Sequence, residues 1–169
     1  MATNVAYKTD ETWPTLPPFQ AAAGSIGAGP ATVQTLTTHG GHAIKITGTA
    51  TRMPEVLEAT ICKILSLDQL DSGWNSYGAK RVEMPAIRGA ISFVLENCFN
   101  VCTYPEVAPN TNGGVELVWA EGRRELEIGT RPDALFDALF VDGDVVYEPE
   151  APISAAKAAE LVKRFRSGI

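Results

Sequence analysis

Hydrophobic residues recur with a helical period in three stretches of the chain: 54–69, 84–101 and 154–166. In the second stretch, Ile87, Ile91 and Val94 lie on one face of a 3.6-residue period, opposite polar positions. Pro54 is tolerated in a first helical turn, and Ser154 is a favoured N-cap residue. The pattern therefore predicts three amphipathic helices, each with one face directed toward a core.

Alternation with a period of two replaces the helical period between residues 115 and 148. Leu126 and Ile128 alternate with Glu125 and Glu127, which is typical of a strand with one face in water. Turn-forming pairs separate the runs: Glu121-Gly122, Arg131-Pro132 and Asp142-Gly143. We therefore predict an α+β fold, with a four-stranded antiparallel meander and helices packed on one of its faces.

The stretch before the first predicted helix falls into two parts. Residues 31–51 are rich in Thr, Val, Ile and Leu around a central pair of glycines, which predicts a β-hairpin. Residues 1–30 are rich in Pro, Ala, Gly and Thr and have no sustained period, which predicts an extended arm. Trp13 and Phe19 are unusual in a solvated spacer, so the arm either docks through them or is plainly disordered. The predicted organisation is this arm followed by one α+β domain over 31–169.

The segment Gly73-Trp74-Asn75-Ser76-Tyr77-Gly78-Ala79 lies between the first two predicted helices. Its glycines accept positive φ, and Asn75 can hydrogen-bond its own backbone. Trp74 and Tyr77 each combine a large ring with one polar atom. One interpretation is a packed loop whose two rings are buried for stability. The alternative is a loop that binds a ligand or partner, because ordered loops often carry function.

This segment, the helix from Glu83 and the run from Pro109 to Trp119 resemble a group of small bacterial and phage proteins. The group has a Gly-Trp-Asp-x-Tyr-x-Ala motif, an amphipathic helix and a Pro…Gly-Gly-x-x-Leu-x-Trp strand. The resemblance covers about residues 66–148. Asn75 stands where the group usually has Asp, and Arg81 stands where a Pro usually precedes the helix. The group has no established activity, so the resemblance implies a fold and a bacterial or phage origin without implying a reaction.

Length and composition are those of an ordinary globular chain. With 169 residues and 45% hydrophobic content, the chain is long enough to bury a sizeable core. No apolar run approaches the roughly 20 residues of a membrane span, and residues 1–11 contain no signal-peptide core. Three cysteines do not make a disulfide framework, which fits a reducing compartment. We therefore expect a cytoplasmic protein without a membrane partner.

The net charge of −6 is distributed unevenly. Acidic residues far outnumber basic ones between 111 and 150, whereas the last predicted helix is basic. An acidic sheet argues against nucleic acid as a partner, because phosphate binding needs clustered Lys and Arg. Charge therefore favours a protein partner, and a homo-oligomer is one form of such an association.

Candidate catalytic and metal-binding residues are few. His39, His42, Cys98 and Cys102 supply four possible zinc ligands, but they are not placed in zinc-binding turns, and Cys98 lies on an apolar helical stripe. Carboxylates on the predicted sheet could support hydrolysis, although alternating Glu on a solvated face is the simpler explanation. Gly-x-Ser-x-Gly and phosphate-loop patterns are absent from the sequence. We therefore predict no metal, no cofactor and no catalytic residue.

These observations favour a non-enzymatic protein-binding module, an accessory or regulatory protein of a bacterial or phage system. Two alternatives stay open: an antitoxin-like inhibitor whose acidic face blocks a basic protein, and a carboxylate-dependent hydrolase. The residues predicted to contact the partner come from the arm, the loop and the sheet: Trp13, Phe19, Trp74, Asn75, Tyr77, Glu116, Glu125 and Glu127.

Overall fold

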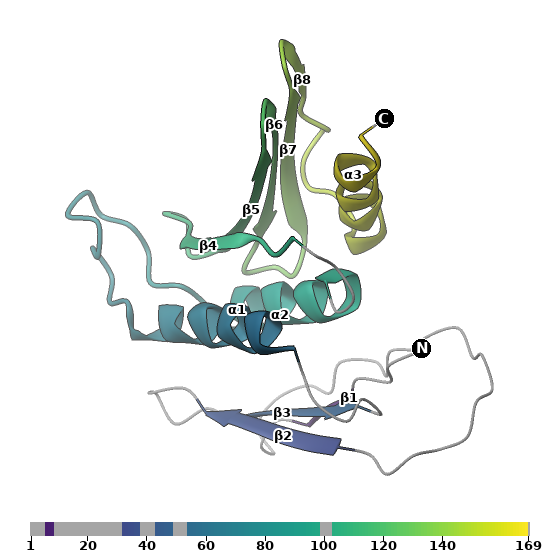
Figure 1. The fold of residues 1–169 in the computed structure, drawn as a ribbon. Helices are drawn as coiled ribbons and strands as arrows, with labels where there is room; N and C mark the ends of the chain where they lie inside the picture. Colours follow the sequence, from purple (N-terminus) through teal and green to yellow (C-terminus); the bar gives the residue numbers. More distant parts are fainter. Residues whose placement is uncertain (1–5, 9–31, 38–42, 49–53, 99–102, 169) are drawn as a thin grey trace. The chain divides into compact units, whose positions relative to one another are not determined.

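The computed structural model describes residues 6–8, 32–37, 43–48, 54–98 and 103–168. The chain divides into two compact units, Met1–Glu55 and Val56–Ile169. Each unit contains one antiparallel sheet, three-stranded in the first and five-stranded in the second (Figure 1).

The sheet of the first unit has the strand order β1-β3-β2. β2 (Thr32–Thr37) and β3 (Ala43–Gly48) pair antiparallel along their whole length, which confirms the predicted hairpin. Their β-branched residues favour this extended backbone. β1 (Ala6–Lys8) pairs with the other edge of β3 and lies within the stretch predicted to be an extended arm. Three residues are too few to show an alternating pattern, so this strand carries no recognisable signal in the sequence.

The sheet of the second unit consists of five sequential strands. They are β4 (Glu106–Pro109), β5 (Val115–Glu121), β6 (Arg124–Thr130), β7 (Phe136–Asp142) and β8 (Val145–Tyr147). The predicted meander corresponds to β5–β8, so the α+β class is confirmed and the predicted number of strands is one too low. β4 escapes prediction because Pro105 precedes it and Pro109 is its last residue. Proline lacks a ladder donor and is tolerated only on an edge strand, which is the position that β4 occupies.

Three helices accompany this sheet: α1 (Glu55–Ser66), α2 (Met84–Cys98) and α3 (Ala155–Ser167). A 3-10 turn, η1 (Leu67–Gln69), continues α1 and packs against α2. The Ser154 side chain accepts a hydrogen bond from Lys157 N at 3.3 Å, which confirms the predicted N-cap. Residues 99–101, the predicted end of the second helix, lie outside the described residues. None of the helices in the described part of the chain has the length and apolarity that crossing a bilayer requires.

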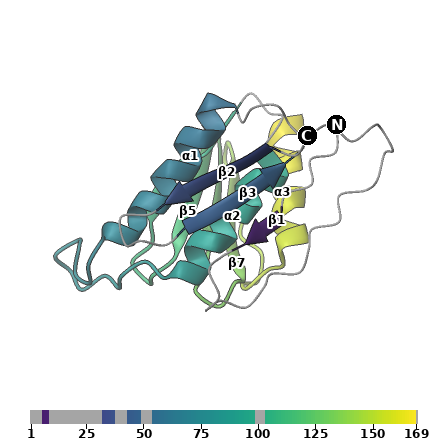
Figure 2. The same ribbon diagram turned by 90° about the horizontal axis from the view of Figure 1, so that it is seen from below.

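α2 and α3 pack on one face of the five-stranded sheet, as predicted. α2 contacts β5 and β6, and α3 contacts β6 and β7 (Figures 1 and 2). Aromatic rings join the layers: Phe93 of α2 lies 5.3 Å from Phe136, and Phe165 of α3 meets Phe140 edge-on at 6.4 Å between centroids. Three alternate residues of each central strand are buried beneath these helices: Val115, Leu117 and Trp119 in β5, Leu126, Ile128 and Thr130 in β6, and Phe136, Ala138 and Phe140 in β7. The opposite residues of the same strands face away from the helices.

Three basic side chains of α3, those of Lys157, Arg164 and Arg166, contact neighbouring groups. Lys157 Nζ lies 3.1 Å from a carboxylate oxygen of Glu160, and the Arg164 guanidinium stacks over two aromatic rings. Arg166 Nη2 lies 3.6 Å from Cys98 Sγ. Burial raises the pKa of the Cys98 thiol to about 11, and the positive charge of Arg166 partly offsets this effect. Cys98 is therefore a neutral, buried side chain, as its place on an apolar stripe predicts.

The segment before α2 lies close against the turn between β4 and β5. Gly113 has a φ of 90°, and a Cβ at this position would lie 2.9 Å from the carbonyl oxygen of Arg81. Only glycine fits such a close approach at positive φ. The buried Thr130 hydroxyl, 3.0 Å from Ala86 O and 3.2 Å from Val115 O, connects α2 to the same end of the sheet. These contacts fix the connection between η1 and α2 on the sheet.

Candidate binding surface

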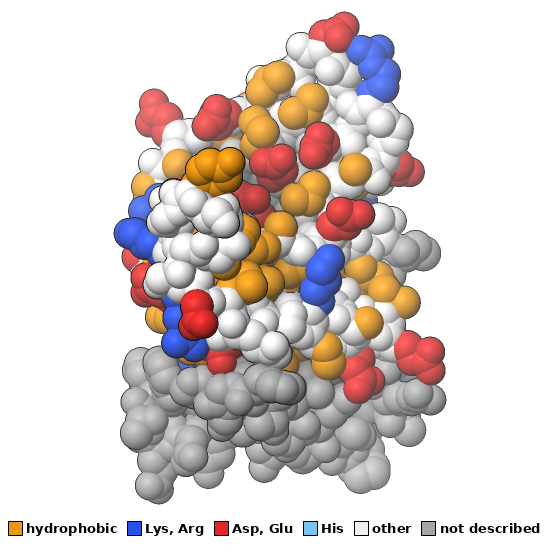
Figure 3. Space-filling model, turned by 90° about the vertical axis from the view of Figure 1, so that its left-hand side faces the viewer, with side chains coloured by type: hydrophobic (Ala, Val, Ile, Leu, Met, Phe, Trp, Pro, Cys, Tyr) orange, Lys and Arg blue, Asp and Glu red, His pale blue; other side chains and the backbone are white. Residues whose placement is uncertain are grey.

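In the described part of the chain, no helix packs on the second face of the five-stranded sheet. We call this surface the open face. It is formed by Glu106, Ala108, Glu116, Val118, Ala120, Glu125, Glu127, Gly129, Asp137, Leu139, Val141 and Val146. Figure 3 shows acidic and apolar side chains interleaved on the side of the molecule that includes this face.

The strand register alternates carboxylates with apolar side chains across the open face. Two rows of directly opposed residues have this pattern: Glu106-Val118-Glu127-Leu139 and Ala120-Glu125-Val141-Val146. Side chains opposed in this way are in contact distance of one another. The central carboxylates therefore have apolar neighbours on adjacent strands, which restrict their access to water.

Glu127 lies on the central strand of the open face. Partial burial raises the pKa of its carboxyl group, and the negative charges of Glu116 and Glu125 raise it further. No ion pair reaches these three carboxylates from the described residues. Glu116 instead accepts a neutral hydrogen bond from Asn110 Nδ2 at 2.9 Å. The centre of the open face therefore combines uncompensated negative charge with apolar side chains.

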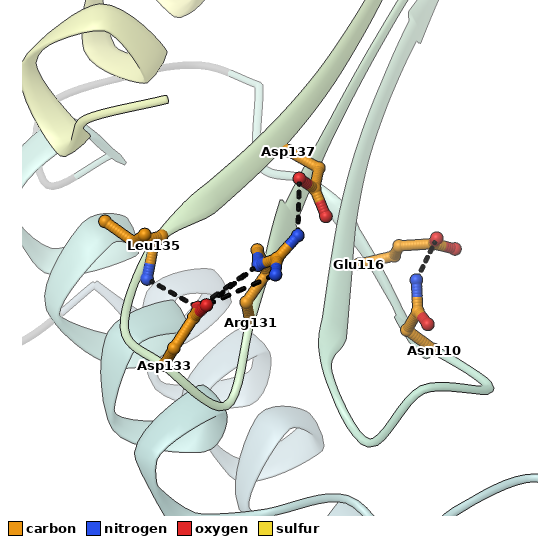
Figure 4. Close-up of polar contacts among 6 residues, drawn as sticks. All are labelled: Asn110, Glu116, Arg131, Asp133, Leu135 and Asp137. Carbon is orange, nitrogen blue, oxygen red and sulfur yellow. Dashed lines mark hydrogen bonds and ion pairs between the residues drawn. The ribbon is translucent and has the colours of Figure 1, made fainter. Parts of the chain in front are cut away.

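A polar cluster occupies the end of the face where β6 leads into β7 (Figure 4). Arg131 pairs with Asp133 at 3.1 Å and with Asp137 at 3.3 Å. Its hydrogen bond lowers the pKa of the Asp133 carboxyl group, which also accepts from Leu135 N at 3.3 Å. This cation closes the turn and neutralises charge at the end of the sheet, so it leaves the charge at the centre unchanged.

The geometry of the carboxylates bears on the hydrolase alternative. Glu116 and Asp137 stand on either side of Gly129 in the register, one on each neighbouring strand. Each is held by a neighbour, Glu116 by Asn110 and Asp137 by Arg131. Among the described residues, no three His, Cys, Asp or Glu side chains are placed to hold a metal ion. Three of the possible zinc ligands lie outside those residues: His39, His42 and Cys102.

Residues 71–80, which we call the Tyr77 loop, are held in place by their own backbone and by the side chains of Asn75 and Trp74. Gly73 N donates to Ala79 O at 2.7 Å. Asn75 Oδ1 accepts two backbone hydrogen bonds, from Tyr77 N at 2.9 Å and from Ala79 N at 3.1 Å. An Asx turn of this kind fixes the main chain without any tertiary packing.

The two rings of the Tyr77 loop have different environments. The interpretation that both rings are buried is wrong for Tyr77, which is 93% exposed. Trp74 is half-buried, and its Nε1 donates to Lys80 O at 3.2 Å. Because Asn75 already satisfies the backbone of the loop, the fold does not require the Tyr77 ring to pack. The alternative, a loop that presents a side chain to a partner, accounts better for this geometry.

The C-terminal end of the Tyr77 loop is attached to the sheet. Lys80 N donates to Thr111 O at 2.8 Å, and Glu83 N donates to Gly113 O at 2.9 Å. Both acceptors belong to the turn between β4 and β5. In Figure 1 the loop projects on the side of the sheet opposite α3, which is the side viewed in Figure 3. The loop and the open face therefore lie on the same side of the second unit.

The two departures from the resembled protein group have structural explanations. Asn75 acts through an oxygen that accepts backbone N–H groups, and an Asp in its place would offer the same acceptor. Arg81 Nη2 lies 3.1 Å from Asp68 Oδ1 and 3.0 Å from Asp68 O. The Asp68 side chain is only 2% exposed, so Arg81 compensates a buried charge that a proline would leave unpaired.

Six of the eight predicted contact residues lie on this side of the unit. Glu116, Glu125 and Glu127 come together on the open face, and the other three belong to the Tyr77 loop: Trp74, Asn75 and Tyr77. Asn75 is turned to the backbone, so its role is to shape the loop. Trp13 and Phe19 lie outside the described residues.

The apolar part of the open face was missed by sequence reasoning. Val118, Leu139 and Val141 share the face with the carboxylates. A signal was present in Phe136–Asp142, where Leu139 and Val141 interrupt the expected alternation with polar residues. A strand that is apolar on both sides is buried on both sides or meets a partner.

Comparisons of the chain with protein-family models, with curated proteins and with solved structures found no match. The architecture of the second unit therefore defines its class. It is an α+β unit with a five-stranded antiparallel sheet, covered by helices on one face, with a candidate binding surface on the other.

Proposed function

We propose that the protein is a non-enzymatic protein-binding module whose open face binds a basic surface of a partner protein. The observation that carries the proposal is the composition of this face, where Glu116, Glu125 and Glu127 alternate with apolar side chains and have no ion-pair partner among the described residues.

The apolar side chains distinguish this face from an ordinary solvated sheet. A sheet face that only meets water carries polar residues at alternate positions. Here Val118, Leu139 and Val141 take several of these positions, and Val146 at the edge is 63% exposed. Apolar groups surrounded by polar ones are the usual composition of a protein–protein interface.

The negative charge of the open face favours partners with basic surfaces. The carboxylates of Glu116 and Glu125 already raise the pKa of Glu127, so any further negative group placed here would be repelled. A Lys or Arg of a partner would instead relieve the repulsion and gain a hydrogen-bonded ion pair in a partly dry setting. Nucleic acid is disfavoured for the same reason, because its phosphates carry the wrong charge.

An antitoxin-like inhibitor is a narrower form of this function. In that case the basic partner would be an enzyme whose active surface is covered by the open face. The same carboxylates support it, since acidic surfaces block basic ones by charge complementarity. The hydrolase alternative gains no such support, because Glu116 and Asp137 are already held by Asn110 and Arg131.

Selection of binding peptides from a random display library tests the proposal. The full chain would serve as bait, with peptides of about 16 residues, whose extended reach is about 50 Å. We expect enrichment of Lys and Arg next to apolar residues.

The double variant Glu125→Lys/Glu127→Lys should lower the affinity for the selected peptides by about tenfold or more at about 50 mM salt. The matched control Glu150→Lys, which changes an exposed charge outside the open face, should leave their affinity unchanged. Selected peptides without basic residues, or equal loss in both variants, would exclude the open face as the binding site.

A further inference from the structure

The Tyr77 loop combines two properties that are seldom found together: a main chain held by hydrogen bonds and a large side chain without intramolecular packing. Tyr77 is 93% exposed, more than any other large hydrophobic residue of the described chain. Its own backbone N–H is bound to Asn75 Oδ1 at 2.9 Å. An aromatic ring that stabilises a fold is buried, so the position of this ring calls for another explanation.

The conformation of the loop is also strained next to Tyr77. Ser76 has a φ of 62°, a left-handed conformation that is uncommon for residues other than glycine, Asn and Asp. Ser76 N donates to Gly73 O at 2.8 Å, so the strained turn is closed by a hydrogen bond. Strained backbone persists where the surroundings fix it, and it concentrates at binding and active sites. At this position it orients the residue that follows, which is Tyr77.

An exposed tyrosine on a hydrogen-bonded main chain has the properties of an interface anchor. Its ring offers a large contact area with few rotatable bonds, and its hydroxyl can make one directed hydrogen bond. Because the main chain of the loop is already ordered, association would immobilise little more than one side chain. Buried aromatic residues supply much of the affinity at protein interfaces.

We propose that Tyr77 anchors the partner that covers the open face, by inserting into an apolar recess of a basic protein. This inference rests on the proposed function. Hydrogen bonds from Lys80 and Glu83 attach the loop to the turn between β4 and β5, and Asn110 of the same turn binds Glu116 of the open face. One partner can therefore contact the ring and the carboxylates together. The carboxylates also argue against a stacked nucleobase as the occupant, because its phosphates would be repelled.

The test uses the peptides selected on the native full chain. Tyr77→Ala should lower their affinity by about tenfold or more, and Tyr77→Phe should retain most of it. The loss should be similar at about 50 mM and about 300 mM salt, since an apolar contact is not screened. The loss from Glu125→Lys/Glu127→Lys should shrink at the higher salt. Val145→Ala serves as the matched control, because it truncates another exposed apolar side chain, 62% exposed, on the hairpin between β7 and β8.

A second pair of variants tests the order of the loop. Asn75→Ala removes the acceptor of two backbone hydrogen bonds and should weaken peptide binding, whereas Asn75→Asp keeps the acceptor and should preserve it. A merely structural role for Asn75 would change the unfolding midpoint without changing affinity. All variants would be compared at temperatures where each remains folded.

The outcomes separate the two proposals. If Tyr77→Ala binds like the native chain while the Glu125→Lys/Glu127→Lys variant loses affinity, the anchor is rejected and the proposed function stands. If only Tyr77→Ala loses affinity, the acidic open face is rejected, and with it a partner shared by both surfaces. A library that yields no peptide above background rejects both. Binding of single-stranded oligonucleotides that depends on Tyr77 would also overturn the anchor as a protein contact.

Discussion

Replacing Glu127 by Gln removes one negative charge. This substitution should stabilise the fold and weaken partner binding. The side chain keeps its size and hydrogen-bonding capacity and loses only its charge. That charge is unfavourable in the folded protein, because Glu127 is partly buried and faces the charges of Glu116 and Glu125. In a complex with a basic partner the same charge is favourable.

The expected stabilisation follows from the contacts. Like charges on neighbouring positions of a sheet cost a few tenths to about 1 kcal/mol, and water screens part of this cost because Glu127 retains some exposure. We therefore expect Glu127→Gln to raise the free energy of unfolding by about 0.3–1 kcal/mol near neutral pH. For a unit of this size, the midpoint of thermal unfolding should rise by about 1–4 °C.

The pH dependence gives a stricter test of the same cause. The pKa of Glu127 in the folded protein lies above its ordinary value of 4.5, so the folded state holds this proton more tightly than the unfolded chain does. The stability contributed by this group is therefore highest below pH 4.5 and falls as pH rises through the folded pKa. Glu127→Gln removes that fall, so its advantage should be largest near pH 7 and vanish near pH 4.

Urea unfolding of the full chain at both pH values measures these differences. Glu121→Gln provides a contrasting control, because Glu121 pairs with Arg124 at 2.8 Å and its loss should be neutral or slightly destabilising. Destabilisation by Glu127→Gln near pH 7, or an advantage of equal size at both pH values, would refute the electrostatic account. Unchanged peptide affinity in the stabilised variant would remove Glu127 from the binding site.

Five further substitutions, at four positions, test the framework that supports the surface. Asn75→Ala should lower stability by about 1–2 kcal/mol through two lost hydrogen bonds, and Asn75→Asp should be close to neutral; thermal unfolding distinguishes them. Gly113→Ala should cost more than about 2 kcal/mol, because its Cβ would meet Arg81 O at 2.9 Å at positive φ. Gly129→Ala, whose Cβ would only make ordinary contact with Asp137 at 3.6 Å, should be tolerated or stabilising in the same urea titration. Arg81→Ala should lower the free energy of unfolding by about 2 kcal/mol or more, because it leaves the carboxylate of Asp68 buried without its cation. If Arg81→Ala has the same urea midpoint as the native chain, the pair contributes nothing to stability.

Local patterns in the sequence were sufficient to predict most of the elements. The three helices and the strands β5–β8 follow from hydrophobic periodicity, and Ser154 was identifiable as an N-cap from its residue type. The helices cover one face of the sheet because Leu126 and Ile128 point to that face while Glu125 and Glu127 point away. β4 was not predictable in the same way, because its pairing with β5 depends on a partner strand and its prolines suggest a loop.

The candidate site was predictable only in part. The carboxylates of the open face were recognisable as alternating positions in the sequence. That Val118 and Leu139 lie in the same row of the sheet could not be predicted, because it depends on the register of three strands. The exposure of Tyr77 could not be read from its residue type, since a tyrosine in a Gly-rich loop packs or protrudes according to what else holds the backbone. The pairing of Arg81 with Asp68 is likewise a tertiary contact between segments with no shared pattern.

The separation of the Tyr77 side chain from the bonds that hold its loop has a consequence for how the protein can change over time. Backbone atoms, Asn75 and Trp74 maintain the loop, so a new side chain at position 77 would meet no neighbour that must adjust to it. Selection for stability and selection for partner choice then act on different residues. A lineage could therefore acquire a new partner by exchanging this one side chain, and an engineer could vary the same position in a library without repairing the fold.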